Sequence, residues 1–222
     1  MKKYAIIVAG GSGTRFGSTL PKQFVPLGGV PVLMRTIKAF ADYDRDINIV
    51  VALPSEHLTL WGDLCALRNF DVPHKVVEGG ANRFESVRNA LFAVNETECL
   101  VAVHDGARPL VSRQVIAAGF ETAARCGTAI PTVPVTDSIR QLDRNGSHNV
   151  SRESLVAVQT PQTFRVEILK EAYTTAFSPL FTDDASVVRH TGDSISRRCE
   201  QHQNHTPYGH QHRRMDTLRR QQ

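Results

Sequence analysis

The sequence lacks several features that would place it in particular classes of protein. None of its apolar runs approaches the roughly 18 consecutive residues of a membrane helix, so we expect no membrane-spanning segment. The N-terminus has no signal-peptide pattern and leads directly into an apolar run, which predicts a cytoplasmic protein. The four cysteines form no C-x-x-C pair, which argues against a structural zinc site.

Most of the chain carries no net charge. The net charge of +4 lies entirely in residues 197–222, which hold six arginines and two acidic residues, whereas residues 1–196 hold 20 basic and 20 acidic residues. A nucleic-acid-binding protein normally carries its basic patch on the folded domain. We therefore expect no nucleic-acid partner, and binding through the tail is the one alternative of that class.

Apolar runs that are typical of buried strands alternate with segments of helical periodicity. The predicted strands are 4–8, 47–53, 75–77, 100–103 and 129–135, and the predicted helices lie near 32–41, 58–67, 83–93, 113–126 and 166–175. This alternation predicts a single α/β domain over residues 1–196, with a mostly parallel, Rossmann-like sheet covered by helices on both faces. Ligands of such sheets bind beyond the carboxyl ends of the strands.

Residues 137–158 interrupt this alternation. Two short extended runs flank Asn145-Gly146, and Asn-Gly between such runs is typical of a β-hairpin. A hairpin of two strands is marginally stable by itself and needs a surface to pack against.

A glycine-rich segment follows the first predicted strand and consists of Ala9, Gly10, Gly11, Ser12, Gly13 and Thr14. Its glycines allow a tight turn whose N–H groups can point at an anion. Arg15 and Lys22 add two cations, and Pro21 fixes the backbone just before Lys22. The pattern predicts a phosphate-binding site, although it matches neither G-x-x-x-x-G-K-[ST] nor G-x-G-x-x-G. An ordinary strand–loop connection is the alternative.

The run A-G-G-x-G-x-R-F with the later P-K-Q resembles the signature of the 2-C-methyl-D-erythritol 4-phosphate cytidylyltransferase family of the non-mevalonate isoprenoid pathway. Further runs at 79–87, 103–109, 159–162 and 182–186 match the family in the same order. The resemblance covers about residues 4–195. It implies an enzyme that transfers CMP from CTP to 2-C-methyl-D-erythritol 4-phosphate and releases pyrophosphate.

In the implied reaction, a phosphate monoester attacks the α-phosphorus of CTP. The nucleophile is already an anion, so we expect catalysis by positioning and charge neutralisation, without a general base. Arg15 and Lys22 are the expected catalytic cations, beside phosphate-binding N–H groups of residues 10–14. Asp105 is the expected Mg²⁺ ligand, because Mg²⁺ commonly takes one or two carboxylates plus phosphate oxygens. A loop or helix-capping role is the alternative for Asp105.

The resemblance also implies where the nucleotide and the second substrate bind. The positions that match the nucleotide site are Gly79, Gly80, Ala81, Arg83 and Ser86. Arg83 is expected either to fix its loop or to contact the nucleotide. The positions expected to bind the polyol phosphate are Asp105, Arg108, Ser138, Arg152, Thr160 and Thr182, of which Arg152 is also expected to be catalytic. Arg108 offers a bidentate contact to a phosphate, whereas His104 is expected only to pack or to form hydrogen bonds.

Ser138 and Arg152 lie on the predicted hairpin, which resembles the family's arm around a second subunit. The resemblance therefore implies a homodimer in which each active site is completed by the neighbouring chain. A surface hairpin with a solvated arginine is the alternative.

The composition changes at about residue 197, where the family carries Val-Glu-Gly, Asn-Ile-Lys-Ile-Thr and an amphipathic helix. Codons for residues 201–205, read one nucleotide later, can encode Asn-Ile-Lys-Ile-Thr, and those for 196–198 can encode Val-Glu-Gly. We infer a frameshift near residues 194–196, which leaves residues 197–222 as an atypical and poorly packed tail. A native basic tail is the alternative.

Two other functions are compatible with the same residues. One is cytidylyl transfer to another polyol phosphate, such as ribitol 5-phosphate. The other is a nucleotide-binding module whose catalysis is impaired, because the family's tail lysine is missing.

Overall fold

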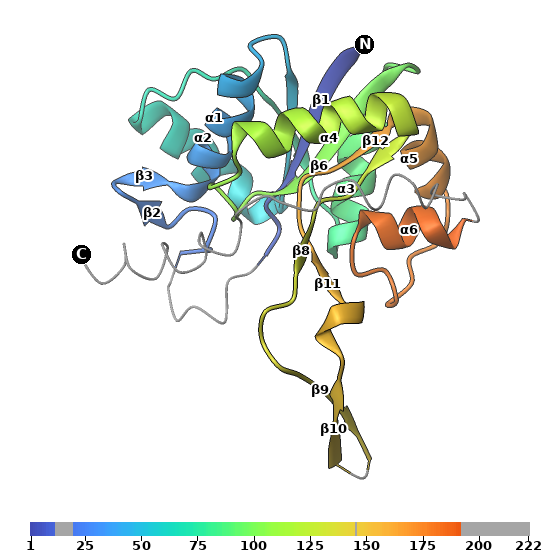
Figure 1. Ribbon diagram of the computed structural model, residues 1–222. Coiled ribbons are helices and arrows are strands. Elements are labelled where there is room, and N and C mark those ends of the chain that lie inside the picture. The colour runs from blue at the N-terminus through green and yellow to red at the C-terminus, as the bar shows by residue number, and fades with distance from the viewer. Residues whose placement is uncertain (12–19, 145, 192–222) are drawn as a thin grey trace.

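The computed structural model describes residues 1–11, 20–144 and 146–191 (Figure 1). Its strands are β1 (Lys2–Val8), β2 (Pro26–Leu27), β3 (Val30–Pro31), β4 (Asn48–Leu53), β5 (Lys75–Glu78), β6 (Cys99–Asp105), β7 (Thr128–Ala129), β8 (Thr132–Pro134), β9 (Ile139–Asp143), β10 (Gly146–Val150), β11 (Val156–Val158) and β12 (Gln162–Arg165). Its helices are α1 (Val32–Tyr43), α2 (Leu58–Leu67), α3 (Arg83–Phe92), α4 (Arg113–Cys126), α5 (Val166–Ala172) and α6 (Asp184–His190), with short 3₁₀ turns at Ser55–His57 and Arg152–Ser154.

The central sheet has the strand order β5-β4-β1-β6-β12-β7. Its first four strands are parallel, and β12 runs antiparallel to both β6 and β7. The strands β1, β4 and β6 are buried along most of their length because their side chains are apolar on both faces. The predicted fold class, a mostly parallel sheet with helices, is confirmed.

Two hydrophobic cores lie on opposite faces of this sheet. Alternate residues of β1 enter different cores, since Ile6 packs with α3, α5 and α6, whereas Ile7 packs with α1, α2 and α4. Both faces are therefore covered by helices, as the sequence predicts. Within the described ranges, no helix has the length and apolar character that crossing a bilayer requires.

The predicted strand 129–135 is wrong in part, because the structure divides it. Thr128–Ala129 pairs with β12 in the central sheet, and Thr132–Pro134 forms a separate ribbon with β11. Between them the carbonyl of Pro131 accepts a 2.8 Å hydrogen bond from the amide of Gln159. The predicted helix 166–175 ends earlier, at Ala172.

The hairpin predicted at 137–158 is confirmed only in part, because its two paired strands span Ile139–Asp143 and Gly146–Val150, whereas Val156–Val158 pairs with β8 instead. β9 and β10 pair antiparallel, with Asp143 opposite Gly146, and their residues are mostly exposed. The β8–β11 ribbon leads from the central sheet to this hairpin, so that the whole segment projects away from the domain (Figure 1). We call residues 132–158 the arm.

Candidate active site

The carboxyl ends of β1, β4, β5 and β6 form one edge at which the predicted site residues gather. Val8, the last residue of β1, lies opposite Ala52 on one side and Asp105 on the other. The backbone continues this alignment beyond the strands, because Gly106 donates to the carbonyl of Val8 over 2.8 Å and Gly79 donates to that of Leu53 over 2.7 Å. The described start of the glycine segment (residues 9–11), residues 79–86 and residues 105–108 therefore lie at one crevice.

A first cavity of about 300 Å³ lies at this edge. Most of the predicted nucleotide-site residues line it, together with Lys22 and Asp105; they are Ala9, Gly10, Gly11, Gly80, Ala81, Arg83 and Ser86. Ser12, Gly13, Thr14 and Arg15 lie outside the described residues, so their predicted roles stay predictions.

Lys22 closes over the start of the glycine segment. A Cβ atom on Gly11 would lie 3.0 Å from Cε of Lys22, so glycine at this position allows the close approach. The next residue, Gln23, is fully buried and donates from Nε2 to the carbonyl of Ala9 over 2.8 Å. Gln23 thus holds the Pro-Lys-Gln segment next to the end of β1. No role was predicted for this residue from the sequence.

Residues 79–82 form a tight loop that leads into α3, whose first turn is residues 83–86. A Cβ atom on Gly80 would lie 2.2 Å from Cβ of Glu85, so this loop requires glycine there. Asn82 caps α3 by accepting a 2.9 Å hydrogen bond from the amide of Glu85. The hydroxyl of Ser86 accepts from the amide of Gly80 over 3.1 Å and donates to the carbonyl of Asn82 over 2.8 Å. Ser86 therefore shapes the loop as well as lining the cavity.

A second cavity of about 280 Å³ adjoins the first. Four of the residues expected to bind the polyol phosphate line it, namely Asp105, Arg108, Thr160 and Thr182. Arg83 and Asp105 line both cavities, so this pair forms the boundary between them. The other two predicted positions, Ser138 and Arg152, lie on the arm and line neither cavity.

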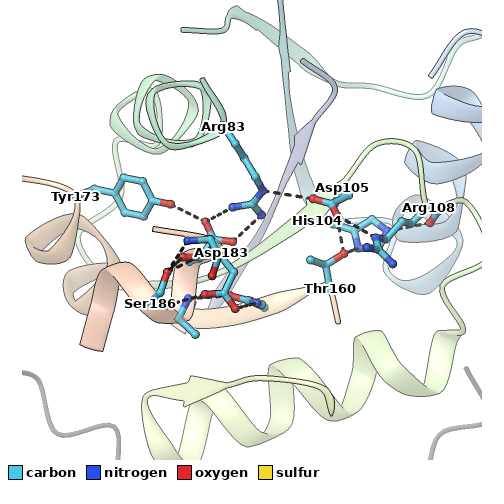
Figure 2. Close-up of polar contacts among 12 residues, drawn as sticks. Arg83, His104, Asp105, Arg108, Thr160, Tyr173, Asp183 and Ser186 are labelled. Carbon is cyan, nitrogen blue, oxygen red and sulfur yellow. Dashed lines mark hydrogen bonds and ion pairs between the residues drawn. The ribbon is translucent and has the colours of Figure 1, made fainter. Parts of the chain in front are cut away.

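Asp105 lies between two guanidinium groups (Figure 2). Its Oδ1 is 3.4 Å from Nε of Arg83, and its Oδ2 accepts from Nε of Arg108 over 2.9 Å. Arg108 also donates to the side-chain carbonyl of Gln159 over 3.2 Å. Burial alone would raise the pKa of Asp105, but the nearby charges of Arg83 and Arg108 outweigh it and hold that pKa below its usual value. The carboxylate is therefore ionised at neutral pH.

His104 is fully buried beneath this turn, as its predicted packing role requires. Its Nε2 is 2.9 Å from the carbonyl of Arg108, which can only accept, so Nε2 carries the proton. Nδ1 must then accept, which makes the hydroxyl of Thr160 the donor in the 2.9 Å bond between them. Burial lowers the pKa of His104 to about 4, so the ring is neutral. Because its proton is engaged with His104, Thr160 supports the turn more than it offers a donor to a ligand.

No role was predicted from the sequence for Asp184, a buried carboxylate that pairs with Arg83. Asp184, at the start of α6, accepts from Nη1 and Nη2 of Arg83 over 3.1 and 2.8 Å, and from the hydroxyl of Tyr173 over 2.6 Å. Burial and the Asp184 charge raise the pKa of Tyr173 well above its usual value. For Arg83, burial disfavours the charge, but Asp184 more than compensates and raises its pKa. The feature of the sequence that pointed to this residue is the run Thr-Asp-Asp-Ala-Ser at 182–186, which contains Asp184 and matches the family.

In the part of the chain that the structure describes, no three His, Cys, Asp or Glu residues come together as a metal site. The crevice does contain the Asp105 carboxylate next to the glycine segment and Lys22. This donor set fits the usual binding of Mg²⁺ in nucleotide sites, where one or two carboxylates act with phosphate oxygens of the substrate.

The chain resembles known proteins both in sequence and in structure. A sequence model of the family described as 2-C-methyl-D-erythritol 4-phosphate cytidylyltransferase matches residues 4–198. The protein of that name from Bacteroides thetaiotaomicron is 50% identical over 192 residues, which span 86% of this chain and 87% of that protein. The crystal structure of the Thermus thermophilus protein of that name is 34% identical, with a TM-score of 0.67 over 86% of this chain and 85% of that one. The corresponding Francisella tularensis structure is 30% identical, with a TM-score of 0.71 over 86% and 87% of the two chains.

Proposed function

The chain belongs to the 2-C-methyl-D-erythritol 4-phosphate cytidylyltransferase family, and we propose that its two adjoining cavities bring CTP and the polyol phosphate together. It is a nucleotidyltransferase that transfers CMP from CTP to 2-C-methyl-D-erythritol 4-phosphate, giving the CDP-linked methylerythritol and pyrophosphate. The observation that carries the proposed arrangement is the shared boundary, since Arg83 and Asp105 line both cavities.

In this arrangement, an oxygen of the substrate phosphate attacks the α-phosphorus of CTP. A bond forms between that oxygen and the α-phosphorus, and the bond to the β-phosphate oxygen breaks, so pyrophosphate leaves with the electron pair. The attacking oxygen is an anion already, which removes the need for a base. The protein then has to hold two anions together and neutralise their charge.

The first cavity is the proposed site of CTP. Lys22 faces the glycine segment and would neutralise charge on the triphosphate, and backbone N–H groups of that segment would hold its oxygens. Arg15 is proposed as the second cation on sequence grounds. Gly80, Ala81 and Ser86 would bound the cytosine, because they line this cavity. Gly79 is proposed there on sequence grounds alone.

The second cavity is the proposed site of the polyol phosphate. Arg108 is about one-third exposed at this cavity and would hold the substrate phosphate. Thr182, which precedes α6, also lines this cavity and would offer its hydroxyl to the same substrate. Thr160 would act mainly by supporting the turn at residues 105–108 through His104.

Asp105 is the residue that would hold Mg²⁺ when CTP is bound. The ion would supply positive charge at the phosphates and help to orient them. Arg83 and Arg108 would keep the Asp105 carboxylate ionised and in place.

We propose a homodimer through the arm because apolar side chains on the arm are exposed to solvent. Val156 is 55% exposed and Val158 is 42% exposed on β11, and both would gain from a partner surface. Arg152 is exposed and donates to the carbonyl of Thr136 over 2.6 Å, which holds it on the arm rather than at its own crevice. We propose that Ser138 and Arg152 reach the second cavity of the partner subunit.

The tail from residue 197 lies outside the described residues, and we propose that it results from a frameshift. The support comes from the genetic code, because codons for residues 201–205 that are read one nucleotide later can encode Asn-Ile-Lys-Ile-Thr. The family match ends at residue 198, next to the proposed shift. Loss of the lysine in that run would weaken the hold on the substrate phosphate.

Pyrophosphate release tests the proposed function directly. The purified chain is given CTP together with 2-C-methyl-D-erythritol 4-phosphate, and in parallel with ribitol 5-phosphate or no second substrate. We expect release that depends on the methylerythritol phosphate and on CTP rather than on ATP, GTP or UTP. Equal rates with both polyol phosphates would contradict the assigned substrate, and release without a polyol phosphate would indicate hydrolysis instead of transfer.

A further inference from the structure

A buried carboxylate lies behind the boundary of the two cavities and lines neither of them. Asp184 is 0% exposed, and its oxygens accept three side-chain hydrogen bonds. Two come from the guanidinium of Arg83 and one from the hydroxyl of Tyr173. A carboxylate at such depth is stable only when it is paired and hydrogen-bonded. The pairing is therefore strict, and it fixes the position of both partners.

The pairing with Asp184 determines where the rest of Arg83 points. A guanidinium is planar and presents its N–H groups in a rigid fork. With Nη1 and Nη2 on Asp184, the remaining Nε is directed at Asp105, whose Oδ1 lies 3.4 Å away. Figure 2 shows Arg83 reaching from α3 to a point between Tyr173 and Asp105. The two carboxylates thus bind different edges of one cation.

These two contacts differ in strength. The bonds to the inaccessible Asp184 are short, at 2.8 and 3.1 Å, whereas the contact to the partly exposed Asp105 is long. Charge-assisted hydrogen bonds are stronger when they are short and shielded from water. Arg83 is therefore bound more strongly by Asp184 than by Asp105. The Asp105 carboxylate thus stays able to interact with the substrates.

We propose that Asp184 is a positioning residue for the reaction: it holds Arg83 at the boundary of the two cavities and so prevents Arg83 from closing onto Asp105. Without the Asp184 charge, the same fork would turn to Asp105, a second carboxylate that it contacts. Asp105 would then be paired with Arg83 on one side and Arg108 on the other. The effect of Asp184 on the reaction rate rests on the proposed function, whereas its effect on the position of Arg83 does not.

Three variants of the full chain separate positioning from general stability. Asp184→Asn keeps the shape of the side chain and removes its charge. Arg83→Lys keeps the positive charge and removes the fork. Val188→Ala is the matched control, because Val188 is buried in the same helix, so its truncation destabilises α6 without touching the polar group.

The first measurement is the NMR signal of the Arg83 Nε–Hε group, assigned by its loss in Arg83→Lys. A guanidinium held by three contacts should give a distinct signal in the wild-type chain and in Val188→Ala. In Asp184→Asn we expect this signal to shift or broaden beyond detection. An unchanged signal in Asp184→Asn, in a chain that is still folded, would overturn the positioning role.

The second measurement is a double-mutant cycle on pyrophosphate release. We expect Asp184→Asn and Arg83→Lys each to lower kcat/KM by about tenfold or more, since small displacements of positioning groups are costly. The double variant should be no worse than the more damaging single one, because Asp184 acts through Arg83. Val188→Ala should stay within about twofold of wild type at a temperature where all variants are folded.

The outcomes are distinguishable from a failure of the proposed function. Losses that multiply in the double variant, or an equal loss in Val188→Ala, would show a merely structural role and overturn the proposal. Absence of pyrophosphate release both from this chain and from the chain with the tail restored by a one-nucleotide shift would contradict the proposed function, and the NMR signal would then decide the role of Asp184 by itself.

Discussion

Lys22 places its charge next to the start of the glycine segment, since its Nζ would lie 3.5 Å from a Cβ atom on Gly11. We predict that Lys22→Ala lowers kcat by about 10²-fold, as the removal of one preorganised charged contact typically does. Steady-state pyrophosphate release measures it. Lys38→Ala is the matched control, because Lys38 lies on α1, lines neither cavity and is paired with Asp42 on the surface. Near-normal kcat in Lys22→Ala would remove Lys22 from the catalytic machinery.

His104 gives a prediction for stability against pH. Its pKa is about 4 in the folded chain and about 6.5 in the unfolded chain, so only the unfolded chain takes up a proton as the pH falls below 6.5. The stability that the neutral ring contributes is fully present above pH 6.5 and is lost as the pH falls toward 4. Between pH 7 and pH 5, we expect the free energy of unfolding to fall by about 2 kcal/mol on this account.

Urea unfolding of the wild type and of His104→Gln, at pH 7, 6 and 5, tests this expectation. The difference between the two chains cancels the contributions of other titrating groups. We expect His104→Gln to be less stable at pH 7 but to lose less stability on acidification. Parallel pH profiles for the two chains would show that His104 is not the group responsible.

At the scale of the elements, the arm carries Arg152 away from the crevice of its own chain. We predict that Arg152→Ala and Lys22→Ala chains complement each other when mixed, because a heterodimer would contain one site with both residues intact. The expected recovery is roughly a quarter of wild-type activity, measured as pyrophosphate release after subunit exchange. Absence of recovery, with exchange proven by mass spectrometry of tagged chains, would show that the sites are not shared.

The sequence predicts those elements whose signal is local. The parallel strands β1, β4 and β6 are apolar runs, and β5 has a short apolar centre. The structure places Lys22 and Asp105 at the first cavity, and Asp105 and Arg108 at the second. The strand β12 has a weaker signal, since Gln162–Arg165 contains one large apolar residue although its first three residues are buried. Its burial comes from its position between β6 and β7, which is a tertiary effect.

The Asp183-Asp184 pair shows the same limit at the site. Both residues stand at the start of α6, where either can cap a helix. Asp183 accepts from the amide of Ser186 over 2.8 Å and forms the cap, whereas Asp184 turns inward to Arg83. Which carboxylate turns inward depends on where α3 places Arg83, about a hundred residues earlier in the chain. Local sequence does not contain that information.

At the scale of the whole molecule, residues 197–222 decide whether this chain is as active as its relatives. Only four of these residues are apolar, too few for the apolar stripe of a packed helix. We predict that the chain binds CTP normally but turns over poorly, and that the tail restored by a one-nucleotide shift raises kcat/KM without changing the Kd for CTP. Equal kcat/KM for the two chains, with DNA sequencing that finds this tail in frame, would refute the frameshift.

The order of the sheet strands along the chain has a consequence during synthesis. Four neighbouring parallel strands, including the central β1, are complete once Asp105 has been made, whereas the sheet itself ends at Arg165. At ordinary elongation rates the ribosome needs roughly 3 to 12 s to make the residues between these points. We expect the four strands to associate in the nascent chain during this interval, before β12 joins the sheet. A reading error near residues 194–196 lies beyond the last residue of the sheet, Arg165, so it leaves every strand of the sheet unchanged. We therefore expect the cell to accumulate a folded protein with an altered end instead of an aggregate.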